Sequence, residues 1–218
     1  MMTYIPSLFK TDLATAATTS ENQDRAEMIE HPKGLLLIIA DGAGGLGGGS
    51  EAAEIVIQIV KETSVSEAEF SNPLRWGHIL TEADHQLYAH PIAGETTAVI
   101  VALSGGFVCG ASVGDSGAFL VQEKTGIELT AQQHRKPLLG SGGALPIPYG
   151  PIPLAGTLLI ATDGLIKYAP MTTIRQIISK NAVKSVANLL IECVRYPSGN
   201  LPDNVTVIVC RKADNLES

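Results

Sequence analysis

The sequence LLLIIADG at residues 35–42 is an unbroken apolar run that ends at Asp41. Three other aspartates also stand where an apolar run ends or begins: Asp115 in VGDS, Asp163 in LLIATDG and Asp203 in DNVTV. Each run predicts a strand, so each carboxylate is expected at a strand end. If these strands gather in one sheet system, the like charges repel one another and need a counter-charge. Hard divalent ions such as Mg²⁺, Mn²⁺ or Ca²⁺ prefer such an all-oxygen ligand set.

The composition indicates an ordinary globular protein. With 218 residues, of which 45% are hydrophobic, residues 1–218 are expected to form a single domain with a sizeable core. The formal net charge of -7 argues against a general nucleic-acid or membrane-surface binder, because both need a basic patch. The sequence does not define an oligomeric state.

The cysteines favour a cytoplasmic location. Cys109, Cys193 and Cys210 all lie in apolar runs without the spacing of zinc ligands, which is typical of buried, reduced thiols. The first 20 residues lack the apolar centre of a signal peptide. No run approaches the roughly 18 apolar residues that a membrane-spanning helix needs.

Periodicity predicts helices and strands along most of the chain. Helices are expected after a capping Ser50 and at 74–88, 171–179 and 183–194. Strands are expected at 35–40, 96–103, 107–113, 118–122, near 127–129, at 158–162 and at 205–211, whereas the Gly- and Pro-rich segment 136–153 is expected to be loop. The apolar strands 96–103 and 107–113 do not alternate, which favours sheets covered on both faces. The sequence therefore predicts two packed sheets with helices outside.

The glycine-rich turn after Asp41 leaves a second interpretation open. Gly42, Gly44 and Gly47 match G-x-G-x-x-G between a strand and a helix, as in dinucleotide-binding folds. That fold also needs a second strand ending in an acid about 20 residues later. Residues 62–67 are too polar for such a strand, and no Gly-Lys-Ser/Thr of a phosphate loop follows. A dinucleotide enzyme would bind nicotinamide or flavin and need no metal ion.

Six short motifs follow one another in the order in which a known family carries them. They are ENQD at 21–24, DGAGG at 41–45, GETT at 94–97, GDS at 114–116, TDGL at 162–165 and DNVT at 203–206. Each motif alone is weak, but six in order along most of the chain are specific together. The chain therefore resembles the metal-dependent serine/threonine phosphatases of type 2C, the PPM family.

The resemblance implies both a fold and an activity. The fold is α+β, a four-layer α-β-β-α sandwich of two mainly antiparallel sheets with the helices on the outside. The activity is hydrolysis of phosphoserine and phosphothreonine in proteins with two or three Mg²⁺ or Mn²⁺ ions. In such a binuclear centre the ions lower the pKa of a bridging water, which attacks phosphorus directly as hydroxide. No covalent phosphoenzyme is needed, which agrees with the lack of a recognisable activated Cys or Ser nucleophile.

The motifs assign metal-binding roles by resemblance. Asp41 is expected to bridge two ions, with the Gly42 carbonyl also coordinating. Asp163 and Asp203 are expected to hold the first ion, and these two with Asp41 form the predicted catalytic set. Asp24 is expected to act largely through bound water.

Two further residues complete the predicted site. Asp115 matches the aspartate that helps to bind a third ion in bacterial members. Asn204 is expected to support Asp203 from behind the ligand set.

The chain departs from the family mainly in substrate binding. Many members carry an arginine shortly before the first motif, which grips the substrate phosphate, but residues 18–20 are Thr, Thr and Ser. Arg25 directly follows the motif and is the candidate replacement. Ala43 stands where animal members place a proposed general acid, and the segment 135–153 is short for the family's flap. A second hypothesis therefore stays open, in which a weak or inactive member acts as a regulatory module that binds a phosphoprotein or kinase.

The remaining predictions concern partners and single charges. The expected partner is a phosphorylated protein substrate, with a Ser/Thr kinase or its targets as associated proteins, and neither nucleic acid nor membrane. Lys33, Arg135 and Lys136 could attract phosphate, although isolated basic residues are usually only solvated. Glu82 and Asp84 are expected on the solvated face of a helix.

Overall fold

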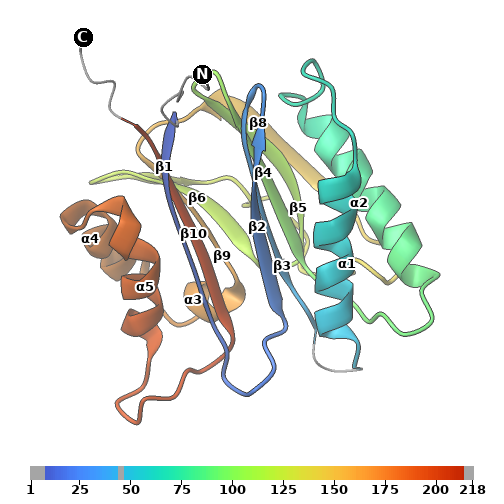
Figure 1. The fold of residues 1–218 in the computed structure, drawn as a ribbon. Helices are drawn as coiled ribbons and strands as arrows, with labels where there is room; N and C mark the ends of the chain where they lie inside the picture. The colour runs from blue at the N-terminus through green and yellow to red at the C-terminus, as the bar shows by residue number, and fades with distance from the viewer. Residues whose placement is uncertain (1–7, 44–46, 214–218) are drawn as a thin grey trace, which may run out of the picture.

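The structure is a computed structural model that describes residues 8–43 and 47–213 of the chain. Its strands are β1 (Phe9–Ala16), β2 (Asp24–His31), β3 (Gly34–Asp41), β4 (Ala98–Ser104), β5 (Phe107–Val113), β6 (Gly117–Val121), β7 (Gly126–Glu128), β8 (Ile147–Pro153), β9 (Thr157–Ala161) and β10 (Val205–Lys212). Its helices are α1 (Gly49–Glu62), α2 (Pro73–Tyr88), α3 (Asp163–Ile166), α4 (Met171–Lys180) and α5 (Val183–Val194). Figure 1 shows the two sheets between α1 and α2 on one side and α4 and α5 on the other.

The strands form two sheets in which neighbouring strands run antiparallel. The strand order is β1-β10-β9-β6-β7 in one sheet and β2-β3-β4-β5-β8 in the other. Together with the outer helices, these sheets make the four-layer α-β-β-α sandwich that the sequence predicts. The predicted fold class is therefore confirmed.

Three apolar layers fill the interfaces of this sandwich. Two of these layers explain why the apolar run in β3 is not interrupted by polar residues. Leu36 and Ile38 pack in the layer beneath α1 and α2, whereas Leu37 and Ile39 pack in the layer between the sheets. Because side chains alternate along a strand and both faces of β3 are covered, both sets must be apolar. The third layer joins α4 and α5 to the other sheet.

Sequence periodicity located the central elements better than the sheet edges. Helices α2 and α5 and the central strands β3, β4 and β5 lie where they were expected. The edge strands β1 and β2 had no prediction, and the expectation of loop throughout 136–153 is wrong because β8 pairs with β5. Pro148, Pro151 and Pro153 lack backbone N–H groups, which an edge strand can tolerate on its open side.

The start of α1 also differs from the expectation. The residue before the helix is Gly48, which has a left-handed φ of 73° and no capping side chain. Ser50 lies inside the first turn, where its Oγ accepts a hydrogen bond from the Arg25 guanidinium at 2.8 Å. The predicted Ser50 cap is therefore wrong.

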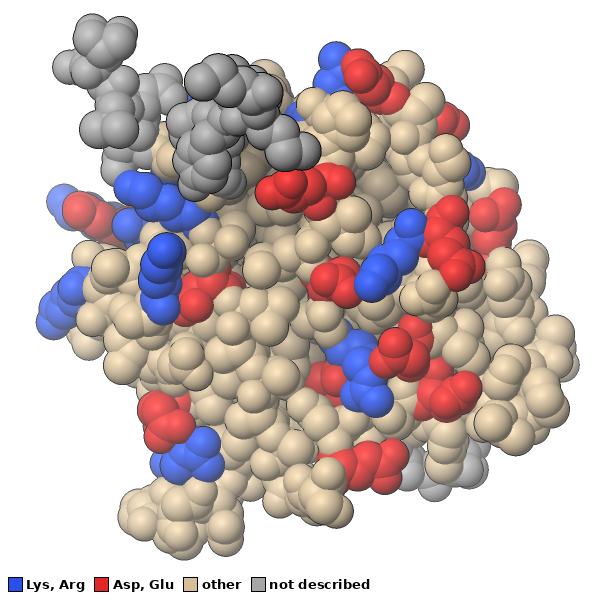
Figure 2. Space-filling model, in the orientation of Figure 1, with Lys and Arg blue, Asp and Glu red and all other residues tan. Residues whose placement is uncertain are grey.

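The described surface carries both signs of charge. Figure 2 shows acidic and basic side chains interspersed on the face seen in Figure 1. Several form ion pairs, such as Lys61 with Glu27 at 2.8 Å. Of the three cysteines, Cys109 and Cys210 are buried as expected, but Cys193 is exposed on α5. Within residues 8–43 and 47–213, no helix is long and apolar enough to cross a membrane.

Candidate active-site cleft

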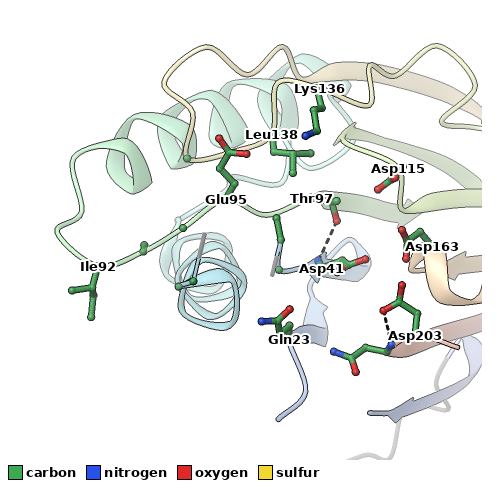
Figure 3. Close-up of a pocket in the computed structure, with 18 of the residues that line it drawn as sticks. Gln23, Asp41, Ile92, Glu95, Thr97, Asp115, Lys136, Leu138, Asp163 and Asp203 are labelled. Carbon is green, nitrogen blue, oxygen red and sulfur yellow. Dashed lines mark hydrogen bonds between the residues drawn. The ribbon is translucent and has the colours of Figure 1, made fainter. Parts of the chain in front are cut away.

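A cleft of about 1010 Å³ lies at one end of the two sheets and collects the four strand-end aspartates. Asp41 comes from the end of β3 and Asp115 from the β5–β6 turn, while Asp163 opens α3 and Asp203 precedes β10. Figure 3 shows the carboxylates of Asp41, Asp163 and Asp203 pointing toward one another. Residues far apart in the sequence thus bring their negative charges to one place.

Asp41 is fixed through its backbone, which leaves its carboxylate for the cleft. Its N–H donates to Thr97 Oγ1 at 3.1 Å, and its carbonyl accepts from Thr97 N and from Thr96 Oγ1, both at 2.9 Å. Thr97 Oγ1 in turn lies 2.8 Å from Ser116 Oγ, beside Asp115. The two threonines of the GETT motif therefore align the aspartates of two other motifs.

Gly42 is required by the close approach of α1. A Cβ built on Gly42 would lie 2.3 Å from both the carbonyl carbon and the oxygen of Gly49, at the helix start. Its N–H donates to the Gln23 carbonyl at 3.2 Å, which ties the end of β3 to the start of β2. Gly42 also lines the cleft. Gly44, the next glycine of the motif, lies outside the described residues.

Asp24 lies behind Asp41 rather than in the lining of the cleft. The two residues are paired across β2 and β3, and Asp24 is only 3% exposed. Its Oδ2 accepts a hydrogen bond from Thr162 Oγ1 at 3.0 Å, whereas its Oδ1 is buried without a partner. Burial raises the pKa of Asp24 to about 6 despite the hydroxyl donors around it.

The carboxylates are crowded enough to disfavour their own ionisation. Burial, followed by repulsion from Asp24, Asp163 and Asp203, raises the pKa of Asp41 to about 9. The pKa of Asp163 is also raised, mainly by burial, even though a lysine contacts it. A cation at the cleft floor would offset this repulsion and favour the ionised forms.

Two cations of the chain itself contact the outer carboxylates. Lys167, one helical turn after Asp163, forms an ion pair with it and lies 3.8 Å from Asp115 Oδ2. Arg135 donates to the same Asp115 oxygen at 2.7 Å. The sequence motifs gave no role to Lys167, although its i+4 spacing from Asp163 is the available signal.

The donor atoms nevertheless fit hard divalent ions. In the part of the chain that the structure describes, no three Asp, Glu, His or Cys side chains are already close enough together to hold an ion. Asp163 pairs instead with Lys167, and Asp115 pairs with Arg135. The aspartates that line the cleft offer oxygen atoms as ligands, and within the described residues Asp24 Oδ1 is a buried acceptor that lacks a partner.

Arg25 does not reach the cleft, contrary to the expectation that it replaces the phosphate-binding arginine. Side chains alternate along β2, so Asp24 faces inward while Arg25 faces α1. Its Nε lies 2.6 Å from Glu54 Oε2, and its other nitrogens bond Ser50 Oγ and the carbonyls of Asn22 and Asp24. The guanidinium is thus committed to structural contacts.

Asn204 supports Asp203 through its backbone. Its N–H donates to Asp203 Oδ1 at 2.9 Å, which fixes the carboxylate beside the cleft. Its side-chain oxygen instead accepts from the Thr18 N–H at 2.9 Å and from the Thr18 hydroxyl. The Asn204 amide therefore holds the β1–β2 connection in place.

Asp84 is buried, contrary to the expectation of a solvated position on α2. It is 2% exposed, and its carboxylate accepts the backbone N–H groups of Gly140, Gly142 and Ala144 at 2.7, 3.1 and 3.0 Å. Gly140 also lines the cleft. One buried carboxylate therefore holds the loop that borders the cleft.

We expect Asp84→Asn to lower the free energy of unfolding by about 1–3 kcal/mol, because an amide cannot accept all three bonds as a carboxylate does. Urea unfolding measures the change. Glu82→Gln on the exposed side of the same helix is the control and should change stability by less than about 0.5 kcal/mol. Equal effects of the two substitutions would contradict the anchoring role.

Comparison with known proteins agrees with this arrangement. The family model described as Protein phosphatase 2C matches residues 14–141. The chain belongs to the protein phosphatase 2C family. It is therefore a metal-dependent protein serine/threonine phosphatase by class, and the family and enzyme class that the motifs predict are confirmed.

Solved structures share the fold of this phosphatase at low sequence identity. Serine/threonine phosphatase Stp1 from Staphylococcus aureus has a TM-score of 0.80 at 18% identity, with 98% of this chain and 100% of that chain covered. The S. agalactiae serine/threonine phosphatase has a TM-score of 0.78 at 21% identity, covering 94% and 100%. The catalytic domain of PstP, solved with two manganese ions, has a TM-score of 0.74 at 19% identity, covering 94% and 99%. Among curated proteins, no match was found.

Proposed function

We propose that this phosphatase hydrolyses phosphoserine and phosphothreonine in proteins at a binuclear Mg²⁺ or Mn²⁺ centre in the cleft. The observation that carries the proposal is the convergence of the Asp41, Asp163 and Asp203 carboxylates (Figure 3). The motif resemblance assigns these three, with the Gly42 carbonyl, as ligands of two ions. Asp24 would contribute through water. Residues from Gln23 to Asn204 line the cleft, which supports treating residues 1–218 as one phosphatase domain.

Asp115 is proposed as a ligand of a third, weaker ion. Its carboxylate already contacts Arg135 and lies near Lys167, so an ion there would have to compete with two cations of the chain. This competition supports a site that is filled less readily than the one between Asp41, Asp163 and Asp203. Asn204 would keep Asp203 in place through its backbone N–H.

The chemistry follows from the charge of the site. Bound divalent ions would supply an activated water for in-line attack on phosphorus and offset the charge of the phosphoryl oxygens. The buried carboxylates position these charges, and the hydrogen bonds from Thr96 and Thr97 keep Asp41 from moving. Ala43 provides no proton donor to the leaving group, and we propose that water supplies the proton.

Hydrolysis of p-nitrophenyl phosphate and of a phosphoserine peptide, with Mn²⁺ and after chelation, tests the proposal. We expect turnover of both substrates that requires the ion and returns when Mn²⁺ is restored. Turnover that survives complete chelation would contradict the metal mechanism. Activity on the small ester without any on the peptide would contradict the protein-phosphatase assignment.

A regulatory module is the second candidate function, and the position of Arg25 favours it. Among the described residues no arginine lines the cleft, which would weaken turnover more than metal binding. Mn²⁺ binding measured by calorimetry, together with phosphopeptide binding without turnover, would support this candidate over the enzyme. Its partner would be a phosphoprotein or a kinase.

We expect Lys167→Met to tighten Mn²⁺ binding about 3- to 10-fold, because it removes a positive charge that contacts Asp163 and faces Asp115. Titration calorimetry measures the dissociation constant. Lys167→Arg keeps the charge and should bind Mn²⁺ as the native protein does. Weaker binding by the Met variant would instead assign Lys167 a role in holding Asp163 in place.

A further inference from the structure

The cleft contains one basic side chain that has no partner among the described residues. Lys136 lines the cleft, and Figure 3 shows its amine directed into it. Within the described residues, the Lys136 side chain forms no hydrogen bond or ion pair. It is also the only Lys or Arg among the described residues that line the cleft.

The other basic side chains near the site are already engaged. Arg25 pairs with Glu54, Arg135 with Asp115, and Lys167 with Asp163. Redirecting any of these toward a substrate would leave a carboxylate without its counter-charge, which is costly where the carboxylate is buried. Lys136 can bind an anion without breaking an existing pair.

The backbone on both sides of Lys136 is hydrogen-bonded to segments that lie beside Asp115 and Asp41. On one side, the His134 carbonyl accepts a hydrogen bond from Gly114 N at 3.1 Å. On the other, Leu139 and Thr96 exchange two backbone hydrogen bonds of 3.0 and 3.1 Å. Thr96 Oγ1 also donates to the Asp41 carbonyl, so the position of Lys136 relative to Asp41 is set by a short chain of contacts.

Asp84 in α2 also holds the loop that carries Lys136. Asp84 accepts the N–H groups of Gly140 and Gly142, directly after the Leu139 contact. The loop that carries Lys136 is therefore held at its end by a buried carboxylate, while the lysine side chain itself is exposed. A fixed backbone with a mobile ammonium suits a residue that meets a ligand arriving from solvent.

We propose that Lys136 binds the phosphoryl group of the substrate from the wall of the cleft opposite Asp41. The proposal rests on the phosphatase function given above. A phosphate monoester carries about two negative charges near neutral pH, and the carboxylates of the cleft repel it. The three N–H donors of an ammonium can contact phosphoryl oxygens that face away from the cleft floor.

Lys136→Met tests this role, with Lys136→Arg as the charge-retaining variant. Lys124→Met, in the turn between β6 and β7, removes an equal charge outside the cleft lining. We expect Lys136→Met to raise the KM for p-nitrophenyl phosphate about 10-fold and to change kcat by less than about 3-fold. Lys136→Arg and Lys124→Met should keep both constants close to those of the native protein.

Binding of inorganic phosphate, followed by calorimetry in the presence of Mn²⁺, gives a readout that needs no turnover. We expect the dissociation constant to rise about 10-fold in Lys136→Met only. Equal phosphate affinity of this variant and the native protein, or no phosphate binding by the native protein, would overturn the proposal. If the protein bound phosphate through Lys136 but showed no turnover, the phosphatase function would be overturned and the Lys136 binding site would still be supported.

A series of phosphopeptides tests whether Lys136 binds the phosphoryl group or acidic residues beside it. If Lys136→Met impaired only peptides with acidic residues beside the phosphoserine, and left p-nitrophenyl phosphate unaffected, the assignment would be overturned. Lys136 would then contact flanking carboxylates of the substrate. Equal impairment of neutral and acidic phosphopeptides is the expected result.

Discussion

Asp41→Asn is expected to abolish Mn²⁺-dependent turnover and, at the same time, to stabilise the metal-free protein. The loss of activity should reach about 1000-fold or more, because the proposed bridging carboxylate becomes a neutral amide. The gain in stability follows from the raised pKa of Asp41, which burial and three neighbouring aspartates produce. The clustered carboxylates would bind ions in the enzyme, but in the metal-free protein their mutual repulsion destabilises the folded state.

The raised pKa of Asp41 sets the sign of the stability change. Unfolded Asp41 ionises above about 3.8, whereas the folded group keeps its proton up to a pKa of about 9. Between these values folding takes up a proton, so the free energy of unfolding falls as pH rises. Asparagine has no such cost, and we expect a gain on the order of 1–3 kcal/mol at pH 8 and a smaller gain at pH 5.

Urea unfolding in the presence of a chelator, at both pH values, measures this gain. Asp115→Asn is the matched control, because Arg135 already neutralises Asp115 at 2.7 Å. The Asp115→Asn substitution should leave the free energy of unfolding unchanged or lower it. A metal-free Asp41→Asn protein that is less stable than the native chain at pH 8 would show that Asp24, Asp163 and Asp203 do not repel the Asp41 carboxylate.

The aspartates could be predicted as one cluster because the relevant signal is local. An apolar run that stops at a carboxylate marks a strand end, and the sandwich brings such ends together. Asp41, Asp163 and Asp203 therefore line one cleft, as the motif order implies. Asp24 has the same motif support, but its burial behind Asp41 depends on the pairing of β2 with β3, which the polar sequence of β2 does not indicate.

The partners of charged side chains could not be predicted in this way. Arg25 points to α1 and Asp84 anchors a loop 56 to 60 residues later in the chain. Both contacts join segments whose relative position is set only by the assembled layers. An aspartate can occupy either an exposed or a buried helix position. The sequence of α2 alone therefore predicted a solvated position for Asp84, because it does not show that the loop covers this residue.

Gly164→Ala is expected to damage the site although it adds a single methyl group. A Cβ on Gly164 would lie 2.0 Å from the carbonyl oxygen of Asn204 and 3.1 Å from a methyl carbon of Val205. A backbone oxygen in a strand entry cannot rotate away, so the start of α3 and the start of β10 must separate. Asp163 and Asp203 stand at these two starts, and their separation would break the proposed ligand set.

We expect Gly164→Ala to lower the free energy of unfolding by about 3 kcal/mol and to weaken Mn²⁺ binding at least 10-fold, with turnover falling further. Gly77→Ala in α2 is the control, because a Cβ there meets no heavy atom within 4 Å. It should stabilise the protein by about 0.5–1 kcal/mol through helix propensity and leave Mn²⁺ binding unchanged. Denaturation and calorimetry on both variants separate the two effects. Unchanged Mn²⁺ affinity in Gly164→Ala would mean that Asp163 and Asp203 do not need this close contact between α3 and β10 to act together.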